Sequence, residues 1–360
     1  MSSRAPDRFL QLALGAGASS SLVIIGLTDQ YNAVVAATLT SSGKWVAGQA
    51  LGDGTTFSRL AVGVGNRGYL QVVGVRTDTS APYLAAWQTD TGWQGSDEIK
   101  SVGGPLAELV ALPAQTTSGA LQLLAVDPLG VPYQTAWLDI SGDWWAGAPL
   151  RAPAPGGFFG VTAALGNGGV SPQLFGVGRT DGAVYLIAYQ PQDGAWTAGQ
   201  RFTTGPNRAG SVLAAPSSDG NLYLFAARGD DGDVEMVAWQ DGGGGWHAPE
   251  PIPTPPGTFG ALAAGAGPSG LELFGIERAS GRPYLIARRS SQRDAWEVGD
   301  ALPAPRVRFR SLVVAGGPKD TQRVFGLDAE GEAYLVATQG AGGRWRAGKR
   351  LADAVQGGAS

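Results

Sequence analysis

Side chains that could perform acid–base or metal chemistry are few in this chain of 360 residues. It has one histidine, His247, and no cysteine, which excludes multi-histidine metal sites, thiolate sites, cysteine nucleophiles and disulfides. The densest acidic cluster is Asp230, Asp231, Asp233 and Glu235, and a glycosidase needs only a pair of carboxylates. This cluster falls in a predicted hairpin turn, where acidic residues are common. We therefore interpret it as solvated turn residues and His247 as a loop or packing residue, and we expect no enzymatic activity, metal or cofactor.

The charges of the chain do not indicate a nucleic-acid partner. Lysine and arginine total 26 against 30 for aspartate and glutamate, and the resulting net charge of −4 argues against binding to a nucleic-acid backbone. A local group of arginines, which we interpret as solvated loop charge, comprises Arg282, Arg288, Arg289, Arg293, Arg306, Arg308 and Arg310. The tripeptide Arg228-Gly229-Asp230 resembles an integrin-recognition sequence, but equivalent turns carry other residues, so we attribute it to drift among turns.

The hydrophobic pattern predicts a protein that stays out of the membrane. No stretch approaches the roughly 18 consecutive apolar residues that a membrane-spanning helix needs. The first residues also lack a basic stretch followed by a long apolar one, so we predict no signal peptide. We expect a soluble protein that is cytoplasmic or released by a non-classical route.

A tryptophan followed six residues later by an apolar residue marks the period of the chain. The segments read WVAGQAL, WQGSDEI, WWAGAPL, WTAGQRF, WHAPEPI, WEVGDAL and WRAGKRL, and they begin at Trp45, Trp93, Trp144, Trp196, Trp246, Trp296 and Trp345. Successive tryptophans are 48, 51, 52, 50, 50 and 49 residues apart. A sevenfold period of this regularity is typical of a repeat architecture.

Three further segments accompany each tryptophan. An apolar run reaches a small residue at Gly26, Gly74, Ala125, Gly176, Ala226, Gly275 and Gly326, where we expect the close approach of another backbone near the axis of a propeller. The next segment, as in YLAAW at 83–87, is apolar on both faces, which suits a sheet packed between two other sheets. The segment that opens each copy, as in FSRLAVG at 57–63, is also strand-like.

Each copy therefore offers four short strands joined by turns rich in glycine and aspartate. We predict an all-β protein in which residues 1–360 form a single seven-bladed β-propeller domain, with four antiparallel strands per blade. The copies run over 9–51, 57–99, 106–150, 159–202, 209–252, 259–302 and 309–351. The pattern leaves open whether each repeat forms one blade or a strand is exchanged across the termini.

The segments L-x-hydrophobic-F-G-V, P-Y-L-x-A-W-Q and G-x-W-x-x-G resemble those of the bacterial seven-bladed lectin family typified by Photorhabdus luminescens lectin. The resemblance covers residues 9–351 as architecture. It implies a non-enzymatic, multivalent sugar-binding protein for fucose or O-methylated glycans, with binding sites between adjacent blades. It also implies glycans or glycoconjugates as partners and a possible homo-oligomer.

Carried over residue by residue, the resemblance places the aromatic walls of such sites at Trp87, Trp93, Trp137, Trp144, Tyr189, Trp196, Trp239 and Trp246, with Trp296 and Trp345 in the same pattern. An aromatic face offers a rigid apolar area for the C–H patches of a pyranose or a methyl ether. The polar partners expected to orient hydroxyl groups are Arg76, Arg179, Arg228 and Glu277, together with Gln88, Gln190, Gln240 and Gln339. Thr38, Arg288 and Thr338 depart from the aromatic pattern, which weakens the case for sites in repeats one, six and seven.

Other interpretations of the same residues stay open at this point. A tryptophan present in all seven copies is explained equally well as the structural wedge of each blade. A protein-interaction scaffold is one alternative function, with Arg306, Arg308 and Arg310 on its partner-binding face. A carbohydrate-active enzyme with paired carboxylates in the central channel is another.

Overall fold

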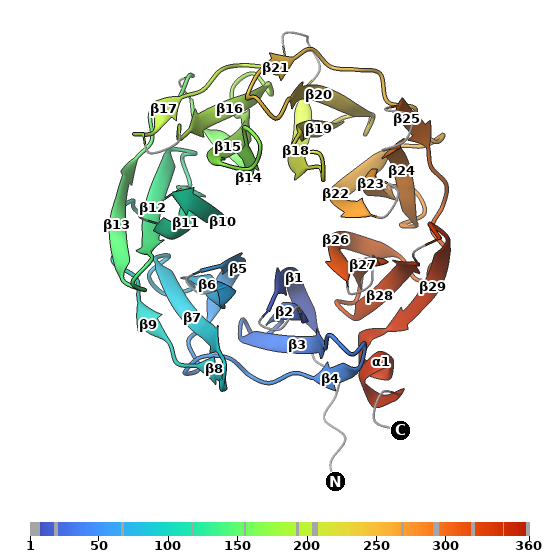
Figure 1. Cartoon of the computed structure of the whole chain (residues 1–360), viewed down its shortest axis with the longest axis horizontal. Coiled ribbons are helices and arrows are strands. Elements are labelled where there is room, and N and C mark those ends of the chain that lie inside the picture. The colour runs from blue at the N-terminus through green and yellow to red at the C-terminus, as the bar shows by residue number, and fades with distance from the viewer. Residues whose placement is uncertain are drawn as a thin grey trace.

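Each of the seven tryptophan repeats folds into one antiparallel sheet of four strands, with a short fifth strand in blade 2, and the seven sheets stand around a central axis, as Figure 1 shows for this computed structural model. The structure describes residues 8–17, 21–65, 68–116, 119–154, 156–191, 194–203, 208–267, 270–290, 295–317, 321–340 and 342–357. The prediction of an all-β, seven-bladed propeller with four antiparallel strands per blade is confirmed.

The first three blades cover residues 9 to 149. Blade 1 contains β1 (Phe9–Ala16), β2 (Leu22–Thr28), β3 (Ala33–Leu39) and β4 (Trp45–Ala47). Blade 2 contains β5 (Phe57–Val64), β6 (Leu70–Arg76), β7 (Pro82–Thr89), β8 (Gly92–Gln94) and the short β9 (Asp97–Glu98), which also pairs with β7. Blade 3 contains β10 (Glu108–Thr116), β11 (Gly119–Val126), β12 (Pro132–Asp139) and β13 (Trp144–Pro149).

The last four blades cover residues 158 to 350. Blade 4 contains β14 (Phe158–Gly166), β15 (Ser171–Gly178), β16 (Val184–Tyr189) and β17 (Thr197–Ala198). Blade 5 contains β18 (Ala209–Pro216), β19 (Leu222–Arg228), β20 (Val234–Gln240) and β21 (Trp246–His247). Blade 6 contains β22 (Phe259–Gly267), β23 (Gly270–Glu277), β24 (Pro283–Ser290) and β25 (Ala295–Val298). Blade 7 contains β26 (Phe309–Gly317), β27 (Thr321–Asp328), β28 (Ala333–Gln339) and β29 (Trp345–Arg350).

The ring closes without exchange of a strand, because every sheet uses consecutive strands of one repeat. Blade 7 meets blade 1 through a hydrogen bond from the Phe9 amide to the Gly331 carbonyl, at 2.7 Å. An equivalent hydrogen bond joins blades 6 and 7, where the Phe309 amide donates to the Gly281 carbonyl at 2.9 Å. A helix that the sequence did not predict, α1 (Leu351–Gly357), covers the closure and buries Leu351 among residues of blades 7 and 1. None of the helices in the described part of the chain is long and apolar enough to cross a membrane.

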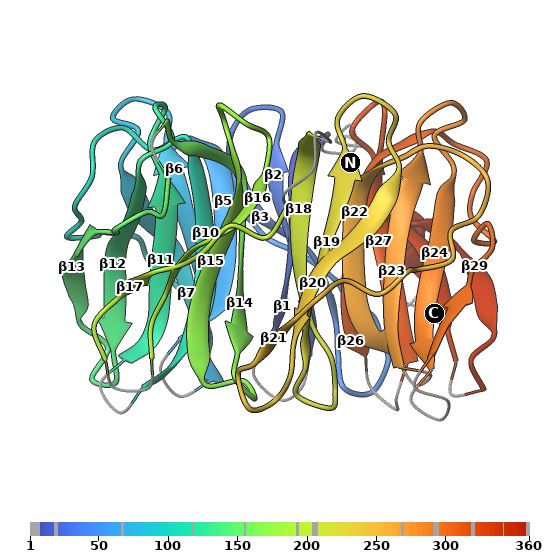
Figure 2. The same cartoon turned by 90° about the horizontal axis from the view of Figure 1, so that it is seen from above.

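The two rims of the ring carry different turns, as the edge-on view in Figure 2 shows. The first strand of each blade runs downward in this view, so the turns between strands one and two and between strands three and four form the lower rim. The turns between strands two and three, together with the connections from one blade to the next, form the upper rim. A residue at the end of a third strand therefore lies near the lower rim, and one at the end of a second strand lies near the upper rim.

The repeated tryptophans act as wedges between blades. Each of the seven is partly buried against a different one of the seven hydrophobic clusters, which run from one blade to the next. Trp45 packs edge-on against Phe325 with ring centroids 6.1 Å apart, and Trp345 packs in the same way against Phe274 at 5.5 Å. The tryptophan of each blade thus fills the gap beside the second strand of the preceding blade.

Two of the small residues of the second strands make room for a side chain, whereas at Gly326 the nearest atom to an added methyl group is the backbone carbonyl oxygen of Ser311. A methyl group added to Gly26 or Gly74 would overlap the ring of Phe9 or Phe57, each on the first strand of the same blade. The expectation of a close backbone approach at these two positions was therefore wrong. A side chain needs the space because the first-strand phenylalanine turns into the junction between blades.

Backbone contact is instead the reason for the glycine three residues after most of the tryptophans. A methyl group on Gly348 would overlap the carbonyl oxygen of Leu335 on the neighbouring third strand. We expect Gly348→Ala to lower the free energy of unfolding by about 1 to 3 kcal/mol, because the fourth strand must move away to relieve the overlap. Chemical denaturation measures the effect, with Gly340→Ala as the control, since no atom lies within 4 Å of a methyl group there. Equal stability of the two variants would contradict this assignment.

Candidate functional site

A pocket of about 470 Å³ opens at the lower rim between blades 2 and 3. Trp87 at the end of β7 and Trp144 at the start of β13 form its aromatic walls, and Leu84 and Leu138 add apolar surface. Polar lining comes from Tyr69, Gln71, Thr89, Asp97, Ser141 and Gly142. The structure therefore brings together two of the aromatic residues that the sequence suggested, one from each neighbouring blade.

Pairs of polar side chains seal the same place at other blade junctions. The Gln122 amide donates to Gln190 across the junction of blades 3 and 4 at 2.6 Å. Gln173 donates to Gln240 between blades 4 and 5 at 2.9 Å. Between blades 6 and 7, Gln339 donates to the Glu272 carboxylate at 2.8 Å. The glutamines expected to orient a sugar at these junctions are thus engaged in joining blades.

The junction of blades 2 and 3 cannot form this pair. Gln71 occupies the position of Gln122 and Gln173, but its counterpart in blade 3 is Leu138, which has no polar atom. Gln71 is 7% exposed, lines the pocket, and has no side-chain hydrogen bond to any residue that the structure describes. A buried amide without a partner is costly, so Gln71 presents its donors and acceptor to whatever enters the pocket.

The fourth strand of blade 2 also departs from the other blades beside this pocket. Ser96 stands where Gly48, Gly147 and Gly348 lie against a third-strand carbonyl in other blades. The strand is divided into β8 and β9 on either side of residues 95 and 96, and blades 1, 4 and 6 show a similar break, with an isolated bridge such as Val34–Ala50 after the short fourth strand. Asp97, at the start of β9, lines the pocket.

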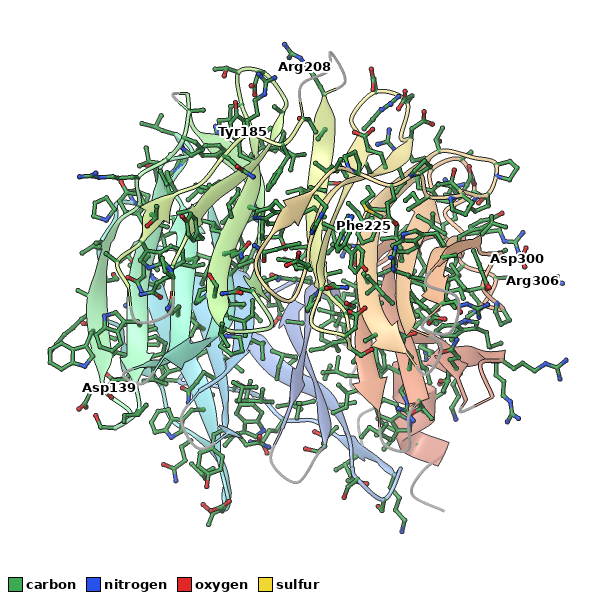
Figure 3. All side chains as sticks on the ribbon, turned by 45° about the horizontal axis from the view of Figure 1, so that its top comes forward. Asp139, Tyr185, Arg208, Phe225, Asp300 and Arg306 are labelled. Carbon is green, nitrogen blue, oxygen red and sulfur yellow. The ribbon has the colours of Figure 1, made fainter. Side chains whose placement is uncertain are left out.

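An acidic turn supports the far side of the pocket. The carboxylate of Asp139 accepts hydrogen bonds from the Ser141 hydroxyl at 2.6 Å and from the Gly142 amide at 2.8 Å. These bonds, with others from Asp143 and Trp145, hold the pKa of Asp139 well below its usual range. Figure 3 shows Asp139 at the outer edge of the ring. The turn that carries Ser141 and Gly142 is therefore fixed before any ligand binds.

The other third-strand aromatics form stacked pairs or pack between blades. Trp137 stacks on Trp145 with centroids 6.1 Å apart and an interplanar angle of 20°. Trp145 is 51% exposed and was missed by the sequence analysis, although it directly follows a repeat tryptophan. In blade 5, Trp239 stacks on His247 at 4.1 Å, and the His247 ring is held by Asp241 at 2.7 Å.

The remaining predicted aromatic walls belong to the blade wedges. Trp93 packs against the cluster between blades 1 and 2, and Trp196 against the cluster between blades 3 and 4. Tyr189 and Trp246 pack against the cluster between blades 4 and 5. The indole N–H groups of Trp196, Trp296 and Trp345 are buried without a partner among the described residues. In these three residues the indole N–H is turned into the protein, away from any ligand at the surface.

The charged residues that the sequence grouped with the aromatic walls lie at the opposite rim. Arg76 ends β6, whereas Trp87 pairs with Gln71 five residues earlier on that strand, so roughly 16 Å separate the two levels. Arg76 forms an ion pair with Asp78, and Arg179 donates to the Phe158 carbonyl at 3.0 Å. The two sets cannot line one pocket, because they occupy opposite ends of the same strands.

The upper-rim turns of blades 5 and 6 use their charges internally. Arg228 lies 3.3 Å from Asp231, 3.4 Å from Asp233 and 3.6 Å from Glu235, which accounts for most of the acidic cluster in this turn. The Glu277 carboxylate accepts the amide of Ser280 at 2.7 Å and that of Ala279 at 3.1 Å. Within the ranges that the structure describes, no three His, Cys, Asp or Glu side chains are grouped so that they could hold a metal ion.

Comparison with known proteins identifies a fold rather than a family. No protein-family model matches the chain, and no curated protein matches its sequence. A structure of Aleuria aurantia lectin in complex with Fucα1-6GlcNAc is similar, with a TM-score of 0.55 and 16% identity over 96% of this chain and 98% of that chain. Another structure of this lectin, described as a six-bladed β-propeller with a novel fucose recognition mode, gives a TM-score of 0.54 and 15% identity over the same shares.

A polysaccharide lyase, Uly1, has a comparable likeness. Its TM-score is 0.54 at 10% identity, over 92% of each chain. Propellers that bind sugars and one that cleaves a polysaccharide therefore share the architecture of this chain. The chain differs from the six-bladed lectin by one blade.

Proposed function

We propose that this protein is a non-enzymatic lectin that binds glycans carrying fucose or O-methylated sugars. The observation that carries the proposal is the pocket between blades 2 and 3, where Trp87 and Trp144 face a cavity that also exposes the unpaired amide of Gln71. Aromatic walls with a few convergent polar groups are the general form of a small-ligand site. The likeness to a fucose-binding propeller supports the choice of a sugar.

The lining of the pocket suits a sugar that bears an apolar substituent. Trp87 and Trp144 offer broad apolar faces, and Leu138 replaces the glutamine that seals other junctions. A methyl group, whether the C6 methyl of fucose or an O-methyl ether, gains free energy from burial against such surfaces. Gln71 and the Ser141 hydroxyl are placed to exchange hydrogen bonds with ring hydroxyls.

Several weak sites on one ring would act together. The stacked pairs Trp137–Trp145 and Trp239–His247 are further aromatic surfaces on other blades. Simultaneous engagement of linked sites can raise the apparent affinity about 10²- to 10⁴-fold. We therefore propose multivalent binding, as in the bacterial seven-bladed lectins that the segments of this chain resemble.

A glycan array that includes fucosylated and O-methylated sugars tests the proposal, followed by competition with the free monosaccharide. We expect Trp87→Ala to weaken monosaccharide binding at this pocket about 30-fold, because it removes one aromatic wall, a loss of about 2 kcal/mol. Titration calorimetry measures the change. Thr38→Ala is the matched control, since Thr38 is the equivalent residue of blade 1.

A second variant keeps the test independent of folding. Gln71→Leu removes the unpaired amide and leaves apolar contacts in place, so we expect weaker sugar binding with unchanged or higher thermal stability. Selective, competable binding that both variants reduce would support the proposal. An absence of binding across the array by folded protein would overturn it, and a search for protein partners would then follow.

A further inference from the structure

A second pocket, of about 550 Å³, lies at the upper rim between blades 6 and 7. Arg282 comes from the turn after β23, and Arg306 and Arg308 come from the connection that leads into β26. Prolines at 283, 303 and 305 form much of the wall. This pocket is at the opposite end of the blades from the aromatic pocket, because it is built from upper-rim turns rather than lower-rim hairpins.

Arg282, Arg306 and Arg308 differ in their contacts from the other arginines nearby in the chain. Arg289 is buried and forms an ion pair with Glu250, Arg288 pairs with Glu297, and Arg310 donates to the Phe9 carbonyl across the ring closure. The expectation of solvated loop charge was therefore wrong for Arg288 and Arg289, which are partly or fully buried, whereas Arg310 is exposed at the start of β26 and Arg293 lies outside the described residues. Among the described residues, the exposed side chains of Arg282, Arg306 and Arg308 form neither a hydrogen bond nor an ion pair.

Little negative charge compensates this group. Hydrogen bonds from Ser280 and Ala279 lower the pKa of Glu277, and the charge of Arg308 adds a smaller effect, so the carboxylate of Glu277 is already held within its own turn. Asp300 is exposed nearby in the sequence and forms no ion pair with these arginines. Neither acid lines the pocket. Arg306 extends outward from the ring in Figure 3, where it is accessible to a ligand.

Hydrogen bonds and proline rings restrain the backbone that carries the arginines. The Leu302 amide donates to the Pro283 carbonyl at 3.0 Å, and the Val307 amide donates to the Pro305 carbonyl at 2.9 Å. The proline rings also fix their own backbone angles. The positive groups are therefore presented on a rigid frame, which lowers the entropic cost of holding a ligand.

We propose that this upper-rim pocket binds the oxyanion of an acidic glycan, a sulfate or carboxylate group on the sugar. Guanidinium groups recognise such groups through paired, charge-assisted hydrogen bonds. The volume of the pocket is in the range of a small-ligand site, which leaves room for a sugar unit as well as its charged group. The choice of a glycan as carrier rests on the proposed lectin function, whereas recognition of the oxyanion does not.

Titration calorimetry with a sulfated disaccharide, its unsulfated counterpart and inorganic sulfate tests this inference. We expect the wild-type protein to bind the sulfated disaccharide, and the double variant Arg306→Gln/Arg308→Gln to lose about tenfold or more in affinity. Raising the salt from 50 to 200 mM should weaken binding of the sulfated disaccharide as well, because exposed charges are screened. Binding of the unsulfated disaccharide should not change in the double variant.

Arg208→Gln is the matched control. Arg208 stands directly before β18 as Arg308 stands before β26, and each packs against a glycine of the preceding upper-rim turn, Gly182 or Gly281. An equal loss in Arg208→Gln, or no binding of the sulfated disaccharide and of inorganic sulfate by wild-type protein, would overturn the inference.

The lectin proposal fails separately. If sulfate binding survives Trp87→Ala and the protein binds none of the neutral glycans on the array, the result would support the oxyanion site and overturn the aromatic one. Binding of inorganic sulfate without any gain from the attached sugar would overturn the glycan as carrier.

Discussion

Replacing Trp296 with alanine is expected to lower the free energy of unfolding by about 3 kcal/mol, the low end for a buried aromatic because this tryptophan is partly exposed. Trp296 packs edge-on against Phe225 at 5.6 Å and against Tyr223 at 5.8 Å, both on blade 5. The Arg289 guanidinium lies 5.8 Å from its ring. Removal of the indole leaves a cavity between two blades that rigid sheets cannot fill. Urea denaturation followed by circular dichroism measures the loss.

Two variants show whether the cost arises from this packing. Trp296→Phe should cost much less, because the indole N–H is buried without a described partner and its removal relieves an unsatisfied donor. Trp145→Ala should also cost little, since this tryptophan is 51% exposed. Equal losses in Trp296→Ala and Trp145→Ala would contradict the role of the repeat tryptophan as a wedge.

The same experiment separates the two interpretations of the repeat tryptophans. A wedge loses stability when it is truncated, whereas a ligand wall loses affinity at unchanged stability. We expect most repeat tryptophans to behave as wedges. Trp144 should do both, because it packs in the cluster between blades 2 and 3 and also lines the aromatic pocket.

The second large effect concerns Glu272, a carboxyl group buried between blades 6 and 7. Its side chain is 0% exposed, and the principal contact is the hydrogen bond from Gln339 at 2.8 Å. Burial raises the pKa of Glu272 to about 7 from the ordinary value of 4.5 for a glutamate, and the hydrogen bond from Gln339 and the charge of Arg288 only partly oppose this rise. The group is therefore largely protonated in the folded protein at mildly acidic pH.

This raised pKa makes the contribution of Glu272 to stability decrease as the pH rises. Below pH 4.5 the folded and unfolded chains both hold the proton, and the contribution is fully present. Between about pH 4.5 and 7 the unfolded chain loses the proton while the folded chain keeps it, so the contribution falls. The total loss is about 3 kcal/mol, from 1.36 kcal/mol per pKa unit.

The variant Glu272→Gln isolates this effect from other titrating groups. Glutamine already occupies the equivalent position in blades 2, 3 and 4, as Gln71, Gln122 and Gln173, so the substitution fits the junction. We expect it to raise stability at pH 8 by about 3 kcal/mol and to change it little at pH 4.5. The measurement is the difference between variant and wild-type unfolding free energies at the two pH values.

An exposed carboxyl group provides the control for Glu272. The Glu98 side chain is 86% exposed, so Glu98→Gln removes a carboxyl group from the surface instead of from a blade junction. A wild-type profile that is parallel to that of Glu272→Gln would show that the pKa of Glu272 is the same in the folded and unfolded chains and would contradict the expected loss.

The fold was predictable because its signals are local. Seven copies of one pattern, each with strand-like periodicity and turn residues, specify seven four-stranded sheets whatever their exact contacts. The turn after β19 and the place of Trp246 at the start of a fourth strand follow from short stretches of sequence. The helix α1 escaped prediction because its seven residues lie where the other repeats have a connection to the next blade.

The candidate sites were harder to predict because they depend on residues far apart in the chain. The sequence grouped Arg76 with Trp87, which are close in sequence but lie at opposite ends of two paired strands. It did not single out Leu138, although this one residue leaves Gln71 unpaired and opens the junction of blades 2 and 3. The role of Leu138 becomes visible only when this junction is compared with the paired amides at the other blade junctions.

By itself, the sequence determined the number of blades, the four strands in each and the position of the wedge tryptophan, because strand alternation and turn formation are set by neighbouring residues. Only the tertiary structure decided which side chains meet across a junction. Gln122 and Gln190 are 68 residues apart, and Trp87 meets Trp144 only when two blades stand side by side. The physical reason is that a blade junction is filled jointly by two separate sheets, so its contents depend on both.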